Sequence, residues 1–235
     1  VESVEMPLYA QQQARGELVI WLTFEGSFWF PRTLLGIQRH FYGFYDQPEL
    51  IHRMNADLLA HQHQVLDRVL SICTPDFMTF AEDMSYNHGP MLSPEMFETF
   101  LAPHYRRIIP RLREAGIPVF IDSDGDVTEP VRWYRSVGAE GFLPLERMAG
   151  VDVAAIRRQW PGLLLLGAYD KTVMHRGDDA VRAEFERLLP VMSQGGFAVS
   201  VDHQTPPGVS LQQYRRYLQI YRQYAERAGA CTRCG

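Results

Sequence analysis

Six short apolar segments, each followed by a stretch with helical periodicity, are the feature that most constrains the fold of this 235-residue chain. They are ELVIWLTFEG (17–26), DFMTFAED (76–83), IPVFIDSDG (117–125), GFLPLE (141–146), LLLLGAYD (163–170) and FAVSVDH (197–203). Strands that alternate with helices pair in parallel through right-handed crossovers. The order therefore predicts an α/β fold, which is either a doubly wound open sheet or a barrel of the (β/α)8 type.

The residues that end these apolar segments favour the barrel. Acidic residues or a histidine stand at every one of these ends, and they are Glu25, Glu82, Asp83, Asp122, Asp124, Glu146, Asp170, Asp202 and His203. In a (β/α)8 barrel the carboxyl ends of all strands meet at one mouth, where the active sites of this fold lie. We therefore predict a TIM-type (β/α)8 barrel with its functional site at this mouth.

A closed barrel of this type has eight β/α units, and the sequence contains six. We interpret the chain as an incomplete barrel whose first two units are missing, so that it belongs to a longer chain or relies on a second chain. Residues 1–16 would then be part of the helix that leads into the third barrel strand. Unpaired strand edges and an interior open to water around LVIWL (18–22) are the expected consequences.

Composition narrows the range of partners and domain arrangements. No linker or composition shift divides the chain, so we predict a single domain over residues 1–235 with a disordered tail over 227–235. That tail carries Cys231 and Cys234, and without a second C-x-x-C pair they do not make a zinc ribbon. A net charge of −5 argues against nucleic acid, and no apolar run reaches the length of a membrane span. Three cysteines are typical of a reducing cytoplasm.

Several segments together resemble the uroporphyrinogen decarboxylase superfamily, which also contains the corrinoid-dependent methyltransferases. They are EDMSYNHGPMLSPEMFETFLAPHYRRI, GIPVFIDSDGD, GFLPLERMAGVDVAAIRRQWP, LLLLGAYDKTVM and SVDHQTPPGVSLQQY, in the family's order. The resemblance runs from about Gly16 to about Ala225. It implies a longer (β/α)8 barrel that acts on a small-molecule substrate at its mouth, and leaves open a homodimer for the full-length protein.

Three functions are compatible with this resemblance. The first is metal-assisted methyl or group transfer, with a corrinoid protein as a candidate partner. The second is decarboxylation of a porphyrinogen-like tetrapyrrole, the lyase reaction of porphyrin biosynthesis. The third, from a different class, is a non-catalytic barrel that binds a ligand or a corrinoid.

The resemblance also identifies a candidate metal site. Where the methyltransferase branch carries a His-x-Cys zinc pair and a second cysteine, this chain carries Asp122, Asp124 and His203. The two aspartates alternate along an extended segment, so they can share an ion only if the chain turns after them, and Gly125 makes such a turn easy. Carboxylates and an imidazole suit Zn, Mn, Fe or Mg. The alternative is an acidic mouth stabilised by backbone N–H groups and arginines.

Catalytic and substrate-binding roles are assigned to further strand-end residues. We predict His203, Asp122 and Glu82 as catalytic, because each combines a strand-end position with a side chain that can move a proton. Substrate contacts are predicted for Trp29, Tyr86, Asp170 and Glu146. Each of the four also has an ordinary structural interpretation: core packing for the aromatic residues, a surface pair with the neighbouring Lys171 for Asp170 and an internal salt bridge for Glu146.

Overall fold

The computed structural model describes residues 5–232 of the chain, and these residues form two compact units. Unit 1 comprises the residues up to Met84 together with Met91–Asp122 and Val131–Glu140, and unit 2 comprises Ser85–Pro90, Ser123–Pro130 and the residues from Gly141 onward. We describe each unit by itself. The single-domain interpretation of the sequence stays a prediction.

Unit 1 is built on three parallel strands. They are β1 (Trp21–Glu25), β2 (Phe77–Ala81) and β5 (Val119–Asp122). The register places Trp21 opposite Phe77 and Ala81 opposite Asp122, so the three strands end at nearly the same level. Their apolar residues Met78, Phe80, Val119 and Ile121 are fully buried. The predicted parallel pairing of the first three segments is confirmed.

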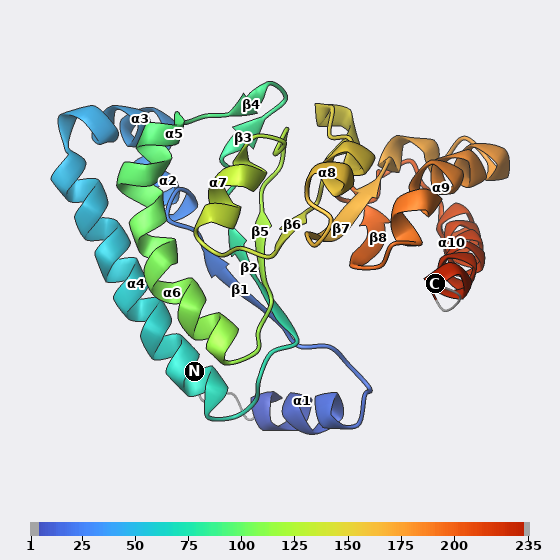
Figure 1. Ribbon diagram of the computed structural model, residues 1–235, viewed down its shortest axis with the longest axis horizontal. Coiled ribbons are helices and arrows are strands. Elements are labelled where there is room, and N and C mark those ends of the chain that lie inside the picture. Colours follow the sequence, from blue (N-terminus) through green and yellow to red (C-terminus); the bar gives the residue numbers. More distant parts are fainter. Residues whose placement is uncertain (1–4, 233–235) are drawn as a thin grey trace. The chain divides into compact units, whose positions relative to one another are not determined.

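Helices connect the strands of unit 1. They are α1 (Glu5–Ala14), α2 (Trp29–Leu35), α3 (Ile37–Asp46), α4 (Pro48–Leu70), α5 (Pro94–Met96), α6 (Ala102–Glu114) and α7 (Pro130–Ser136), the last of which enters unit 1 at Val131. The helix α1 confirms the helical prediction for the described part of residues 1–16. Figure 1 shows α4 and α6 side by side, and their inward faces bury residues such as Leu66 and Ile108.

The helical segment from Ser93 to Glu114 is divided into parts. Ser93 caps its start, because its hydroxyl accepts the N–H of Met96 at 3.2 Å. A π-helical turn at Phe97–Leu101 then separates α5 from α6. Pro103 has no N–H to donate, and the helix widens immediately before it. The turn places Phe100 beside α4.

Unit 2 also contains three parallel strands. They are β6 (Gly141–Leu143), β7 (Leu164–Tyr169) and β8 (Phe197–Val201), with Gly141 opposite Leu164 and Tyr169 opposite Val201. The helices are α8 (Val153–Gln159), α9 (Asp178–Met192) and α10 (Leu211–Thr232). A short antiparallel hairpin of β3 (Ser85–Tyr86) and β4 (Gly89–Pro90) also belongs to unit 2.

Three expectations from the sequence concern the exposed strand edge, the C-terminal tail and membrane-spanning helices. In unit 1, Trp21 on β1 is 51% exposed although it lies in an apolar strand. In unit 2, α10 continues through Thr232, so the described part of the tail predicted to be disordered is helical. Residues 233–235, including Cys234, lie outside the described residues. Within residues 5–232, no helix has both the length and the apolar character needed to cross a bilayer.

Candidate functional site

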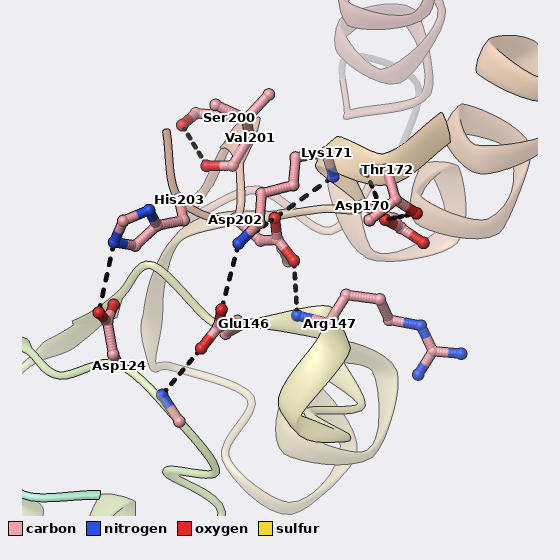
Figure 2. A network of polar contacts seen from close by, with 12 residues as sticks. Asp124, Glu146, Arg147, Asp170, Lys171, Thr172, Ser200, Val201, Asp202 and His203 are labelled. Carbon is pink, nitrogen blue, oxygen red and sulfur yellow. Dashed lines mark hydrogen bonds and ion pairs between the residues drawn. The ribbon is translucent and has the colours of Figure 1, made fainter. Parts of the chain in front are cut away.

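The ends of the three strands of unit 2 carry a connected set of charged side chains. Glu146 follows β6, Asp170 and Lys171 follow β7, and Asp202 and His203 follow β8. Figure 2 shows Lys171 between the carboxylates of Glu146 and Asp202, with His203 turned toward Asp124. We call Asp124, Glu146, Lys171, Asp202 and His203 the polar cluster of unit 2. The prediction that strand-end side chains gather is confirmed for this unit.

Asp202 is the structural centre of the polar cluster. It is fully buried, and its Oδ2 accepts the N–H of Arg147 at 2.8 Å. Its Oδ1 accepts the N–H of Lys171 at 3.3 Å and lies 3.6 Å from the Lys171 Nζ. Burial raises the pKa of Asp202, whereas the positive charge of Lys171 and the two backbone N–H groups lower it. Asp202 thus fixes the residues that follow three neighbouring strands.

Glu146 and Lys171 form a half-enclosed ion pair. The Lys171 Nζ donates to Glu146 Oε1 at 3.1 Å, and Glu146 Oε2 accepts the N–H of Gly125 at 3.1 Å. The salt bridge that the sequence offered as the ordinary interpretation of Glu146 is therefore present. Because Lys171 is the single lysine of the chain, it supplies the one amine side chain at these strand ends.

Asp124 and His203 form the open part of the polar cluster. The His203 Nε2 lies 3.3 Å from Asp124 Oδ2, and the two side chains are 40% and 41% exposed. The predicted turn after Asp124 is present, because Gly125 has a φ of +83°. A Cβ at Gly125 would lie 2.6 Å from the backbone nitrogen of Tyr86, so this close approach requires glycine.

Two residues predicted to contact substrate have local partners. Asp170 caps its own turn, since its Oδ1 accepts the Thr172 N–H at 2.8 Å and the Thr172 hydroxyl at 2.6 Å. Tyr86, on β3, is half exposed, and its ring meets the edge of His88 at a centroid distance of 5.7 Å. These contacts give both side chains a structural role, and their predicted substrate contacts stay predictions.

Glu82, in unit 1, is enclosed completely. Its Oε2 accepts the N–H groups of Phe28 at 2.8 Å and Trp29 at 3.2 Å, and its Oε1 accepts the hydroxyls of Tyr134 at 3.0 Å and Tyr105. Burial raises the pKa of Glu82 to about 7, against the opposing effect of these four donors. A fully buried carboxyl with four donors is a structural anchor, and its catalytic role stays a prediction that this geometry does not favour.

Trp29 and Asp122 also belong to unit 1. The Arg32 guanidinium lies 5.0 Å from the centre of the Trp29 ring, so this indole already contacts a cation. Asp122 is the last residue of β5, and its carbonyl accepts the N–H of Glu82 at 2.8 Å. Its half-buried side chain ends the strand as the sequence indicates.

The donor set for a metal is partly assembled. Asp124 and His203 are in contact and open to solvent, and both are chemically able to bind Zn, Mn, Fe or Mg. Asp122, the third predicted ligand, is described with unit 1. Across residues 5–232, no group of three or more His, Cys, Asp and Glu side chains is placed as a metal site. The open pair fits part of a coordination shell that would need a further ligand.

The ion pairs that Lys171 forms with Glu146 and Asp202 were not predicted from the sequence. A lysine beside an aspartate is commonplace on protein surfaces, and nothing local distinguishes this one. The available signal was its uniqueness in a chain with 23 basic Lys and Arg residues, together with its position directly after a strand. The partners that enclose it lie 25 and 31 positions away in the sequence.

Comparison with known proteins identifies the class and then the family. The alternation of parallel strands and helices, with polar residues at the strand ends, defines an incomplete (β/α) barrel of the TIM type. The family model described as "Uroporphyrinogen decarboxylase (URO-D)" matches residues 37–224. The chain therefore belongs to the uroporphyrinogen decarboxylase family, as the sequence motifs indicated.

One solved structure supports the fold. A methyltransferase from Methanosarcina mazei is 14% identical, with a TM-score of 0.70 over 93% of this chain. The chain spans 62% of the length of that methyltransferase. A second structure, titled "Native KDPGal structure", is 13% identical over 88% of this chain and 96% of its own, with a TM-score of 0.30. The comparison with curated proteins finds no match.

Proposed function

We propose that this protein is an enzyme of the uroporphyrinogen decarboxylase family that acts on a small molecule at the polar cluster of unit 2. The observation that carries the proposal is the contrast within the cluster. Asp202 and Glu146 are enclosed and hold Lys171 in place, whereas Asp124 and His203 meet at 3.3 Å with about two fifths of each side chain exposed. A reacting substrate needs an acid–base pair that it can reach and neighbouring residues that are fixed in place, and the cluster has both features.

The reaction we propose is metal-assisted methyl or group transfer. Asp124 and His203, completed by Asp122, would hold a divalent ion, for which Zn, Mn, Fe and Mg are the candidates. Such an ion would polarise a heteroatom of the substrate or activate a thiol acceptor. A corrinoid protein is the proposed source of the methyl group, and the cytoplasm the proposed compartment. The name of the similar Methanosarcina mazei protein agrees with this class of reaction, although the likeness itself concerns the fold.

Metal binding can be tested directly by calorimetric titration of metal-free protein with each divalent ion. We expect at least one ion to bind, and Asp124→Asn and His203→Gln to weaken that binding by about tenfold or more. Asp126→Asn is the matched control, because Asp126 accepts the Thr128 N–H at 2.9 Å outside the cluster. Uptake of no ion by the wild type, or equal binding by wild type and Asp124→Asn, would refute the metal-assisted reaction.

Decarboxylation of a tetrapyrrole is the second candidate, and the Asp124–His203 pair also favours it. A neighbouring carboxylate holds an imidazole in one orientation and supports proton transfer, which the carbon that loses CO2 needs. Because this reaction needs no metal in the family, the absence of an assembled third ligand among the described residues does not count against it. Product analysis with uroporphyrinogen distinguishes the two: loss of carboxyl groups by wild type but not by His203→Gln supports the lyase. Tight binding of a tetrapyrrole or corrinoid without turnover would instead support a non-catalytic barrel.

A further inference from the structure

A buried group of hydrogen-bonding side chains lies in unit 1, where β2 ends. Glu82 is at its centre, and its members from the helices are Tyr105 on α6 and Tyr134 on α7. The sulfur of Met84 completes the group through its contact with Tyr134. All four side chains are completely enclosed. The group contains none of the residues of the polar cluster, so it is independent of the proposed reaction.

The contacts of Glu82 suit an ionised carboxylate, which accepts about four hydrogen bonds, two at each oxygen. Its Oε2 accepts the N–H groups of Phe28 at 2.8 Å and Trp29 at 3.2 Å. Its Oε1 accepts the hydroxyls of Tyr134 at 3.0 Å and Tyr105. In the ionised form all four acceptor positions are therefore filled, and both hydroxyl hydrogens point to the carboxylate.

A protonated Glu82 requires a different arrangement of hydrogens. Its proton cannot lie on Oε2, because the two N–H groups that meet this oxygen cannot accept a hydrogen bond. On Oε1 the proton faces hydroxyl oxygens, and Tyr134 can accept it if its own hydrogen turns to another acceptor. The Met84 sulfur is that acceptor, 2.9 Å from the Tyr134 hydroxyl oxygen. A route through Tyr105, whose hydroxyl also interacts with that of Tyr134, ends on the same sulfur.

The surroundings leave Glu82 as the member of this group that titrates near neutral pH. Burial raises its pKa to about 7, and among the described residues no charged side chain contributes to the shift. Burial also raises the pKa of both tyrosines well above the usual value, so they keep their protons. His104 packs on the ring of Tyr105, and His40 packs on the ring of Phe28. Burial lowers the pKa of each histidine to about 4, so both are neutral near pH 7.

We propose that the Tyr134 hydroxyl is a two-position switch, which donates to Met84 while Glu82 is protonated and to Glu82 once that carboxyl has released its proton to solvent. The switch couples pH to the start of α2, because Glu82 Oε2 binds the first N–H groups of this helix. Loss of the proton makes these hydrogen bonds charge-assisted and stronger. Because α2 begins at Trp29, a residue predicted to contact substrate, the anchoring of that residue depends on pH near neutrality.

The sulfur of Met84 distinguishes this switch from the effect of burial alone. Met84→Leu keeps the volume of the side chain but removes the acceptor that the Tyr134 hydrogen needs when Glu82 is protonated. The protonated form is then selectively destabilised, so the pKa of Glu82 should fall by about 0.5 to 1. Met78→Leu is the matched control, since it makes the same change at a fully buried methionine of β2, and it should leave this pKa unchanged.

Two measurements on the whole chain follow the proton and the sulfur separately. Infrared difference spectra of the wild type against Glu82→Gln report the carbonyl stretch of the protonated carboxyl group as a function of pH. NMR of methyl-labelled methionine reports Met84, whose resonance is assigned by its loss in Met84→Leu. This resonance should shift with the same midpoint as the infrared band and should not titrate in Glu82→Gln. A Met84 resonance that is independent of pH in the wild type, or a pKa in Met84→Leu equal to or above that of the wild type, would overturn the proposal.

Discussion

The enclosed carboxyl group of Glu82 should make the stability of this protein depend on pH in an unusual direction. Most carboxylates have a lowered pKa in the folded state and stabilise it as pH rises. Burial instead raises the pKa of Glu82 from 4.5 to about 7. The folded state therefore binds this proton more tightly than the unfolded chain does. Its contribution to stability is complete below about pH 4.5 and is lost as pH rises through about 7.

The magnitude follows from the two pKa values. Their difference, multiplied by about 1.4 kcal/mol for each pKa unit, gives about 3 kcal/mol between acidic and mildly alkaline pH. Glu82→Gln removes the titrating group but keeps an oxygen for the N–H groups of Phe28 and Trp29. It also keeps polar contact with the hydroxyls of Tyr105 and Tyr134. The variant should therefore gain stability relative to the wild type as pH rises.

Urea denaturation followed by circular dichroism, at pH values from about 5 to about 8, measures this difference directly. Subtracting the wild-type free energy of unfolding from that of Glu82→Gln cancels all groups that titrate in both proteins. We expect the difference to increase by about 2 to 3 kcal/mol over this range in favour of the variant, because part of the effect lies below pH 5. A difference that is independent of pH, or that changes in favour of the wild type, would show that Glu82 is charged in the folded state throughout.

Three further changes test other parts of the structure. Burial lowers the pKa of His40 to about 4, so the wild type should lose stability as pH falls from about 6.5 to about 4. His40→Phe should not show this loss, and melting temperatures at acidic and neutral pH check this. Asp202→Ala should lower the free energy of unfolding by about 3 kcal/mol in urea titrations, since two backbone N–H groups lose their acceptor, and Asp202→Asn should cost less. Gly167→Ala should destabilise by more than about 2 kcal/mol, because φ is +108° and a Cβ would lie 1.9 Å from the Pro144 carbonyl oxygen, whereas Gly162→Ala, in open space, should be neutral.

The strands were largely predictable because each is a short apolar run with a polar end, and both properties are local. One strand boundary and one hairpin were not predictable. GFLPLE was expected to be a strand over all six residues, and β6 ends at Leu143, immediately before Pro144, which has no N–H for a strand ladder. The hairpin of β3 and β4 was not predicted, because each of its strands is two residues long and has no alternating pattern to detect.

The roles of the site residues were less predictable because they depend on partners far away in the sequence. Glu82 looks like any strand-end carboxylate, and its enclosure depends on tyrosines 23 and 52 positions later. Lys171 looks like a surface residue until Glu146 and Asp202 are placed around it. Conversely, the turn at Gly125 could be inferred, since a glycine after two aspartates is a local pattern, whereas the role of His203 stays a prediction.

The acidic stretch Asp122-Ser-Asp-Gly-Asp shows how exposure decides which carboxylates are available for chemistry. Asp126 uses its Oδ1 to accept the Thr128 N–H, so it ends the loop as a structural cap. Asp124 is directed by the turn at Gly125 toward His203 and remains two fifths exposed. The repulsion that crowded carboxylates would otherwise suffer is relieved because they have different partners. A substrate or an ion that reaches unit 2 from solvent would therefore meet Asp124 and His203 before Asp202 or Glu146. Substitutions of Asp124 or His203 should alter ligand binding with little effect on the free energy of unfolding. Substitutions of Asp202 or Glu146 should lower the free energy of unfolding with little direct effect on ligand binding.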